Sequence, residues 1–153
     1  MPEVGSTAPD FSLYDYDRKI RKLSEFLVEG KKTILAFFPG AFTGVCTQEA
    51  CAFRDNLSRL GAMDAVVLGV SRDSLDSHAR FIEKYGLNFT LLSDEDLKVN
   101  NLYHTWVEKE NYGRKYWGTE RSTFVIGKDG KILKIFRKVK VDGHEQEVLS
   151  ALS

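Results

Sequence analysis

The two cysteines of the chain, Cys46 and Cys51, lie five positions apart in the stretch PGAFTGVCTQEAC, residues 39–51. Two thiols at this spacing could form a buried structural pair, bind a soft metal ion, or act as a nucleophile and a second thiol that reacts with it. A chain of 153 residues can bury a sizeable core without a disulfide. In the reducing cytoplasm that we expect for this chain, two cysteines would be a poor structural cross-link, which favours a thiol role, while a buried structural pair stays open.

A predicted buried strand leads directly to these cysteines. Residues 33–38 form a continuous apolar run, TILAFF, which Pro39–Gly40 ends. Thr43 is a suitable N-cap for the helix that follows, and this places Cys46 at the third helical position. The unpaired backbone N–H groups and the helix dipole at that position favour a thiolate over a thiol.

Ionisation alone does not make a cysteine an efficient enzyme nucleophile. A free thiol has a pKa of about 8.5 and is about 3% ionised at pH 7, so complete ionisation gains at most about 30-fold in rate, or about 2 kcal/mol. A thiol enzyme also needs donors that hold the substrate and stabilise its leaving group in the transition state. Thr43 and an arginine are the natural candidates for those donors.

Strand and helix patterns alternate along the chain. Residues 11–27 predict an N-terminal hairpin that runs into a helical turn and covers one end of a sheet. After the strand at 33–38, we expect a helix over Cys46–Leu60, a strand over Ala65–Ser71, a helix over Ser74–Tyr85, a strand within 88–94, a helix that starts at Asp94, a hairpin over 121–139 with an Asp-Gly turn, and a helical segment over 142–152. This order predicts an α/β, thioredoxin-like fold with a central mixed β-sheet flanked by helices, formed as a single domain over residues 1–153.

Composition and charge argue against several kinds of partner. Lys plus Arg and Asp plus Glu both total 22, so no global field favours nucleic acid or an anionic membrane. The basic stretch 128–140 alternates with apolar residues, which predicts the solvent-facing side of an edge strand. The N-terminus has no signal-peptide pattern, and no stretch reaches the roughly 18 apolar residues of a membrane span. We therefore expect a cytoplasmic protein with no nucleic-acid or membrane partner.

Four segments together carry a family likeness. They are PGAFTGVC, which has the pattern P-x-x-x-T-x-x-C, and VGSTAPDFSL, TQEACAFRD and ERSTFVIGKDGKI. In sequence and in order along the chain, these segments resemble the motifs of the peroxiredoxins, which are thiol peroxidases with a thioredoxin-like fold. The Cys-x-x-x-x-Cys spacing resembles the bacterioferritin-comigratory or PrxQ branch, whose members are atypical two-cysteine enzymes.

The resemblance implies a role for each residue at the start of the predicted helix. Cys46 would be the peroxidatic nucleophile, which attacks a hydroperoxide and becomes a sulfenic acid. Thr43 would donate its hydroxyl to the bound peroxide, and Pro39 would shield the sulfur from water. Neither a bound cofactor nor a metal is implied.

The resemblance also implies partners for the nucleophile. Arg121, in ERSTF, would supply fixed positive charge beside the thiolate and the substrate, and Glu49 would orient its guanidinium. Cys51 would be the resolving cysteine, which condenses with the sulfenic acid to form an intramolecular disulfide. Thioredoxin, glutaredoxin or a similar dithiol protein would then reduce this disulfide.

Helix geometry sets a condition on that disulfide. Residues five apart on an α-helix are separated by about 7.5 Å of rise and about 140° of rotation, which exceeds the reach of about 7 Å for a disulfide. If Cys46 and Cys51 pair, the helix must unwind locally. We therefore expect a cycle between a folded form that reacts with peroxide and a locally unwound disulfide form.

Other interpretations remain open at this stage. A thioredoxin-fold copper-delivery module could use the two cysteines as ligands, although the chain lacks the close thiol spacing and dedicated histidine typical of such proteins. His78, His104 and His144 are scattered, and His78 shares an apolar helical stripe that predicts partial burial. The aromatic-rich segment 103–118 could pack as a loop or hairpin, shape a pocket or form a dimer contact, so the pattern permits a monomer or a homodimer.

Overall fold

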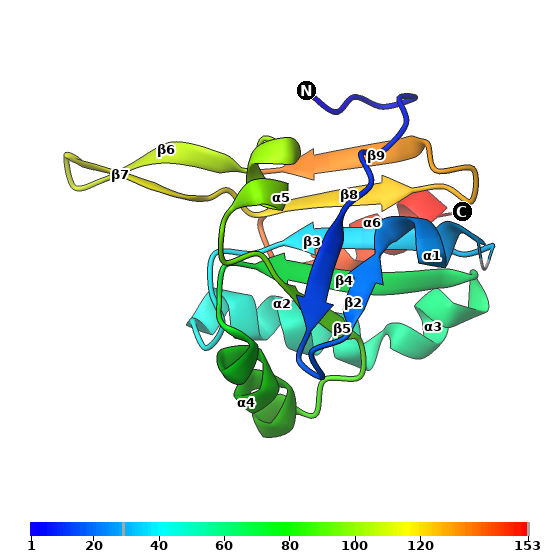
Figure 1. Ribbon diagram of the computed structural model, residues 1–153, viewed down its shortest axis with the longest axis horizontal. Helices are drawn as coiled ribbons and strands as arrows, with labels where there is room; N and C mark the ends of the chain where they lie inside the picture. The colour runs from blue at the N-terminus through cyan, green and yellow to red at the C-terminus, as the bar shows by residue number, and fades with distance from the viewer. Residues whose placement is uncertain (29, 153) are drawn as a thin grey trace.

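The computed structural model describes residues 1–28 and 30–152 and contains a seven-stranded mixed sheet with the strand order β2-β1-β5-β4-β3-β8-β9 (Figure 1). A separate two-stranded ribbon consists of β6 and β7. The strands are β1 (Ser12–Asp15), β2 (Ile20–Lys22), β3 (Lys32–Phe37), β4 (Ala65–Ser71), β5 (Thr90–Ser93), β6 (Trp106–Asn111), β7 (Arg114–Thr119), β8 (Ser122–Ile126) and β9 (Ile132–Arg137). The helices are α1 (Leu23–Val28), α2 (Gly44–Asp55), α3 (Leu57–Ala62), α4 (Leu75–Tyr85), α5 (Lys98–Leu102) and α6 (His144–Leu152).

The sheet topology confirms the predicted α/β, thioredoxin-like arrangement. Strands β3, β4 and β5 are parallel, and β8 and β9 continue the sheet in antiparallel fashion beside β3. The N-terminal hairpin was expected to cover one end of the sheet. Instead, β1 pairs with β5, so the hairpin extends the sheet at one edge.

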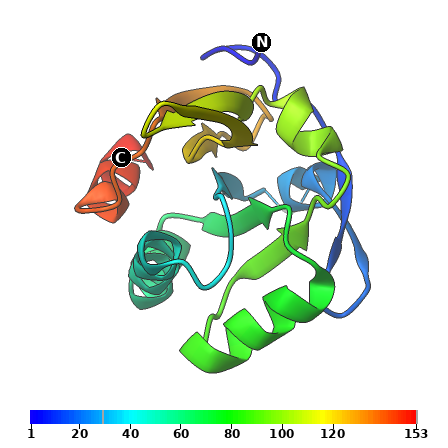
Figure 2. The same cartoon turned by 90° about the vertical axis from the view of Figure 1, so that its left-hand side faces the viewer.

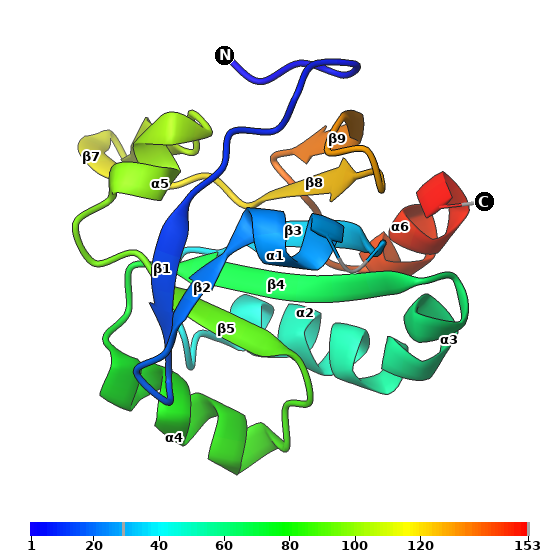
Figure 3. The ribbon, with the colours of Figure 1, turned by 45° about the vertical axis from the view of Figure 1, so that its right-hand side comes forward.

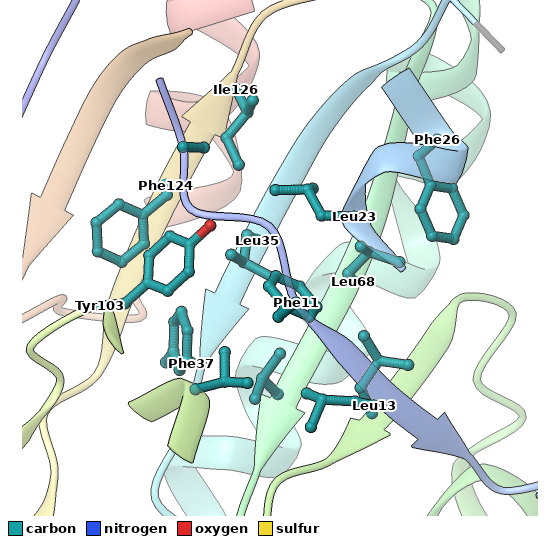
Figure 4. Close-up of a cluster of buried hydrophobic side chains, with 14 of the residues drawn as sticks. Phe11, Leu13, Leu23, Phe26, Leu35, Phe37, Leu68, Tyr103, Phe124 and Ile126 are labelled. Atoms are coloured by element: carbon teal, nitrogen blue, oxygen red, sulfur yellow. The ribbon is translucent and has the colours of Figure 1, made fainter. Parts of the chain in front are cut away.

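Helices cover both faces of the sheet (Figures 2 and 3). On one face, α1, α5 and the N-terminal segment enclose the apolar cluster in Figure 4, which includes Phe11, Phe37, Tyr103 and Phe124. The Tyr103 hydroxyl donates to the carbonyl oxygen of Pro9 at 2.5 Å, and burial raises the pKa of this tyrosine. On the other face, α2, α3, α4 and α6 pack against the sheet.

Two predicted helices have different bounds. The helix expected over Cys46–Leu60 is divided into α2 and α3 at Asn56, whose side-chain amide donates to the carbonyl of Ala52 and competes with the helical hydrogen bonds. The helix expected to start at Asp94 begins at Lys98. The Asp94 carboxylate still accepts hydrogen bonds from the backbone of the first turn of α5. The prediction that an acidic residue stabilises the start of this helix is therefore confirmed, and the predicted first residue is wrong.

The C-terminal part of the sheet agrees with its predicted patterns. Strand β9 forms the sheet edge, as the basic alternation indicated, and Gly130 in the Asp-Gly turn has a φ of 83°. The aromatic-rich segment contributes the β6–β7 hairpin, which projects away from the sheet (Figure 1). Across residues 1–28 and 30–152, no helix has the length and apolarity required to cross a bilayer.

His78 in α4 is fully buried, whereas the apolar stripe predicted partial burial. The hydroxyl of Ser71 lies 2.6 Å from His78 Nε2 and 2.6 Å from a carboxylate oxygen of Asp73. A carboxylate carries no proton, so Ser71 must donate to Asp73, and His78 Nε2–H must donate to Ser71. Nδ1 is buried and has no hydrogen-bond partner among the described residues, so an added proton there would be unpaired. Burial lowers the pKa of His78 to about 4, and Asp73 opposes this change only partly.

This buried histidine predicts a loss of stability in mild acid. Because the pKa of His78 is lowered from 6.5 to about 4 on folding, the unfolded chain binds the proton more readily between these values. The free energy of unfolding should therefore rise with pH across this window. The contribution of His78 should make it about 3 kcal/mol lower at pH 4 than at pH 7. Urea unfolding of the wild type and of His78→Gln, whose amide can still donate to Ser71, measures the difference. Equal pH dependence in the two proteins would contradict the assignment.

Candidate active site

The pairing of β3 with β8 brings two distant segments of the chain together. Phe37, the last residue of β3, lies opposite Ser122, the first residue of β8, in antiparallel register. Arg121 directly precedes β8, so it lies beside the carboxyl end of β3. From that end of β3 the chain turns towards α2 (Figures 1 and 2). The sheet register therefore carries Arg121 to the helix that begins 77 residues earlier, at Gly44.

Thr43 is the N-cap of α2, as predicted. Its backbone is extended, and its hydroxyl oxygen accepts a hydrogen bond from the backbone N–H of Cys46 at 3.3 Å. The same hydroxyl donates to the carbonyl oxygen of Gly40 at 3.3 Å. The first turn of α2 contains no acidic residue, so the sulfur of Cys46 is the group there that can carry negative charge.

One guanidinium group joins the nucleophile to a buried carboxylate. Arg121 Nη2 donates to Cys46 Sγ at 3.0 Å, and Nη1 donates to Glu49 Oε1 at 2.8 Å. Cys46 is 2% exposed, and the side chains of Arg121 and Glu49 are 10% and 6% exposed. The structure therefore brings together Cys46, Glu49 and Arg121, as the sequence motifs predicted.

The charges of this group stabilise one another. Burial lowers the pKa of Arg121, but the Glu49 carboxylate and the Cys46 sulfur raise it by more, so the guanidinium stays charged. Burial raises the pKa of Glu49, and Arg121 opposes that rise only in part, so the pKa stays above its usual value. In a poorly solvated site, a fixed cation at 3.0 Å from sulfur stabilises a thiolate much more strongly than it would in water.

A buried polar network holds the backbone next to Arg121. The side-chain oxygen of Asn100 accepts hydrogen bonds from the hydroxyls of Thr105 and Thr119, both at 2.9 Å. The Asn100 amide donates to Asp94 at 2.8 Å, and the backbone N–H of Glu120 donates to the carbonyl of Thr105 at 2.7 Å. These bonds fix the path of residues 119–121, and so they limit the positions that the guanidinium can take.

The other two predicted residues flank Cys46 on the same segment, one in the loop before α2 and one within α2. Pro39 is half-buried at the start of the loop that follows β3. Cys51 is a free, half-buried thiol on α2, and the helix is continuous between it and Cys46, which is also a free thiol. In this folded form the two thiols therefore have the helical separation that is too large for a disulfide.

Two residues near the site were missed from the sequence. Lys109 on β6 donates to the carbonyl of Thr119, and its pKa is lowered by burial and by the charge of Arg121. Nothing in the pattern of the exposed ribbon distinguishes this lysine from its neighbours. Asp73 accepts a hydrogen bond from the N–H of Ala41 in the loop before Cys46, at 2.8 Å. Its position just after β4, which is parallel to β3, was a usable signal because polar residues at such strand ends meet.

The fold and the site together define a class of protein. A thioredoxin-like sheet carries a cysteine at a helix N-terminus, where an arginine held by a glutamate contacts the sulfur. The arrangement is that of a thiol-based enzyme, with a cysteine beside a fixed positive charge.

Comparison with known proteins identifies the family. The model of the AhpC/TSA family matches residues 4–135, and the chain belongs to this family. It is 43% identical over 150 residues to peroxiredoxin Bcp of Bacillus subtilis (98% of this chain, 94% of the relative) and 41% identical over 150 residues to peroxiredoxin Bcp of Escherichia coli K12 (98% and 95%).

Solved structures support the same assignment. A cysteine-to-serine mutant of PrxQ from Xylella fastidiosa superposes with a TM-score of 0.93 at 34% identity, covering 99% of this chain and 96% of that one. The bacterioferritin comigratory protein of Xanthomonas campestris gives a TM-score of 0.87 at 35% identity, covering 93% and 89%. The resemblance to the peroxiredoxins and to their PrxQ branch is confirmed.

The copper-delivery alternative is not favoured, because the relatives are peroxiredoxins. Over the parts of the chain that the structure describes, no group of three or more His, Cys, Asp or Glu side chains is arranged to hold a metal ion.

Because Arg121 donates to both Glu49 and the Cys46 sulfur, we expect that lysine cannot replace it. A lysine has one nitrogen, which cannot reach both Glu49 and the sulfur in the fixed directions of the guanidinium. Arg121→Lys should lower the second-order rate constant for oxidation of Cys46 by hydrogen peroxide by about 10- to 100-fold, which corresponds to about 1.4–2.8 kcal/mol. Stopped-flow or quenched-flow kinetics measures this constant.

Arg137→Lys is the matched control. Arg137 lies on the neighbouring strand β9 and donates to the carbonyl oxygens of Tyr103 and His104. Like Arg121, its guanidinium binds two acceptors, but neither of them is the sulfur. Its replacement should leave the peroxide rate within about threefold of the wild type. Equal losses in the two variants would show that Arg121 acts only through the stability of the fold.

Proposed function

We propose that this protein reduces hydrogen peroxide and organic hydroperoxides through Cys46, and that Cys51 resolves the oxidised form. The observation that carries the proposal is the contact of Arg121 with both the Cys46 sulfur and Glu49 at the N-terminus of α2. The membership of the AhpC/TSA family and the likeness to PrxQ structures support the same activity. The enzyme is a peroxidase of the peroxiredoxin type.

The first step transfers one oxygen atom to sulfur. The Cys46 thiolate attacks the terminal oxygen of the hydroperoxide, the O–O bond breaks, and sulfenic acid and an alkoxide or hydroxide form. The leaving group takes up a proton and departs as alcohol or water. The hydroxyl of Thr43 is free to turn from Gly40 to the peroxide, and Arg121 stabilises the negative charge that moves from sulfur to the leaving oxygen. Pro39 limits the access of water to the sulfur.

The second step forms a disulfide within the chain. The thiol of Cys51 attacks the sulfenic sulfur of Cys46, an S–S bond forms, and water leaves. Because both residues lie on the continuous helix α2, this step requires part of α2 to unwind. A dithiol protein such as thioredoxin or glutaredoxin then reduces the disulfide by thiol–disulfide exchange and returns both cysteines to thiols.

The substrate range and setting follow from the chemistry and from relatives. The Xanthomonas campestris relative is described as having alkyl peroxide reduction activity, which supports alkyl hydroperoxides as substrates here. Exposed apolar side chains at Phe42 and Val45, which directly precede Thr43 and Cys46 in the chain, suit an apolar substituent on the peroxide. We propose that the enzyme acts in the cytoplasm in redox homeostasis, as a monomer or homodimer of one domain spanning residues 1–153.

Cysteine substitutions separate the two proposed thiol roles. Cys46→Ser should abolish peroxide consumption with dithiothreitol, because the nucleophile is lost. Cys51→Ser should react once with one equivalent of peroxide, gain one oxygen atom at Cys46, and then fail to turn over with thioredoxin. Intact-mass analysis followed by peptide mapping checks both outcomes. An unmodified Cys46 in Cys51→Ser would overturn the assignment of the nucleophile.

Disulfide formation should also change the secondary structure. Oxidation of the wild type with one equivalent of peroxide should weaken the helical signal at 222 nm in far-ultraviolet circular dichroism, and dithiothreitol should restore it. Cys51→Ser treated in the same way is the control and should keep its signal, because its helix need not unwind. A mass-verified disulfide with unchanged helix content would contradict the requirement for unwinding.

A further inference from the structure

A hydrogen-bonded cluster outside the Cys46 site reaches the loop that leads to it. The cluster contains Ser71 at the end of β4, Asp73, and His78 of α4. Ser71 and His78 are fully buried, and the Asp73 side chain is 21% exposed. Ser71 donates its only hydroxyl proton to Asp73 and is sealed from solvent, so the cluster is not a nucleophilic triad despite its residue types.

The cluster ends on one peptide group of the loop. The Asp73 oxygen that accepts from Ser71 also accepts from the backbone N–H of Ala41, at 2.8 Å. The carbonyl of the same peptide group belongs to Gly40, and it accepts the hydroxyl proton of Thr43 at 3.3 Å. The Thr43 oxygen in turn accepts from the N–H of Cys46. A continuous series of hydrogen bonds therefore runs from Asp73 through the Gly40–Ala41 peptide and Thr43 to Cys46.

Asp73 is held by parts of the fold other than α2. Its carbonyl accepts a hydrogen bond from the hydroxyl of Ser93 in β5 at 2.6 Å, and the carbonyl of Ser71 accepts from the N–H of Asp94 at 2.8 Å. These bonds tie the Asp73 segment to the central strands β4 and β5. Through Asp73, the loop before Cys46 is therefore fixed to the sheet, and its orientation does not depend on α2 alone.

The loop needs such an anchor because its backbone is strained. Phe42 has a φ of 67°, in the left-handed region that an aromatic residue rarely adopts. Its ring packs against Phe81 of α4 with a centroid distance of 5.1 Å, while 42% of the residue stays exposed. The peptide bound by Asp73, Gly40–Ala41, lies one residue before Phe42. Without the carboxylate, this peptide could rotate about ψ of Gly40 and φ of Ala41, which would turn the Gly40 carbonyl away from Thr43.

We propose that Asp73 is a positioning residue of the peroxidase reaction. It fixes the Gly40–Ala41 peptide plane and thereby holds the Thr43 side chain of the resting enzyme in the rotamer from which its hydroxyl proton can turn to the peroxide. This inference rests on the proposed function, because it assigns Asp73 to the same reaction. Asp73 does not touch the substrate. Its effect should therefore pass through Thr43 and should be specific for peroxide, whose transition state needs the hydroxyl.

The first experiment compares two reagents in a Cys51→Ser background, where Cys46 is the only thiol. Adding Asp73→Ala should lower the second-order rate constant with hydrogen peroxide by about 10- to 100-fold, as expected for a small misplacement of a catalytic group. The rate constant with iodoacetamide, which does not need the Thr43 hydroxyl, should change by less than about threefold. Asp73→Asn keeps an acceptor oxygen for Ala41 and should recover part of the lost peroxide rate.

Asp15→Asn is the matched control for a general loss of stability. Asp15 is buried, and one of its carboxylate oxygens accepts the backbone N–H groups of Asp17 and Lys19 in the β1–β2 turn. It therefore binds loop N–H groups as Asp73 does, at the opposite edge of the fold from Arg121. Its peroxide and iodoacetamide rates should match those of the parent. If Asp73→Ala does not fold, the comparison of Asp73→Asn with Asp15→Asn replaces it. The ratio of the peroxide rate constant to the iodoacetamide rate constant should then be at least about threefold lower in Asp73→Asn than in Asp15→Asn.

The second experiment is a double-mutant cycle through Thr43. In a Thr43→Val background, which lacks the hydroxyl, Asp73→Ala should lower the peroxide rate by no more than about twofold, because the two residues act as one unit. In a Thr43→Ser background, which keeps the hydroxyl, the full effect should return. Equal losses in the two backgrounds, or equal losses with peroxide and iodoacetamide, would overturn the inference.

The parent protein separates this inference from the function on which it rests. If Cys46 in Cys51→Ser reacts with peroxide no faster than free cysteine, the proposed function fails. If the parent reacts quickly and Asp73→Ala reacts equally quickly, the peroxidase assignment stands and the role of Asp73 is wrong.

Discussion

The site depends on one guanidinium group that contacts both a sulfur atom and a carboxyl group in a poorly solvated place. Arg121 contacts the Cys46 sulfur at 3.0 Å and Glu49 at 2.8 Å, and all three side chains are almost fully buried. Buried charges are costly unless they are paired, so removal of Arg121 would leave the Glu49 carboxylate buried without its partner. The position of Arg121 is set by the β3–β8 register and by the Asn100 network, and both must therefore be intact for Arg121 to contact the sulfur.

Helix α2 has two requirements that oppose each other. Its first turn places Cys46 at the positive end of the helix dipole, which needs a well-formed helix end. The same helix keeps Cys51 out of reach of Cys46, so the proposed disulfide needs the helix to open. The break at Asn56 separates α2 from α3, and this confines the proposed unwinding to a 12-residue segment while α3 can keep its contact with β4.

The carboxyl ends of parallel strands explain why polar groups gather on this side of the sheet. Strands β3 and β4 run side by side in register, so the loop after β3 and the Ser71–Asp73 segment after β4 emerge together. The α4 side of this junction contributes His78 and Phe81, which support Asp73 and Phe42 respectively. The loop before Cys46 is thus fixed by both a carboxylate and an aromatic contact, neither of which comes from α2.

Local patterns determined much of this protein. The apolar run before Pro39, the N-cap at Thr43 and the alternation of strands and helices depend on nearby residues, and the structure confirms them. The family motifs correctly singled out Glu49 and Arg121 as neighbours of Cys46. Helix ends were less predictable, because the side chain of Asn56 and the distant carboxylate of Asp94 compete with or replace local backbone bonds.

Tertiary structure alone decided how the hairpin β1–β2 joins the sheet, how Lys109 lies against Thr119, and how Asp73 holds the Ala41 N–H. Each of these contacts joins residues from different strands or loops, and its strength depends on the burial and the direction of the hydrogen-bonding groups. A sequence pattern encodes which side chains could make such bonds. The packing of the sheet and its helices selects the bonds that form, because only packing sets the distance between the groups and removes the competing water.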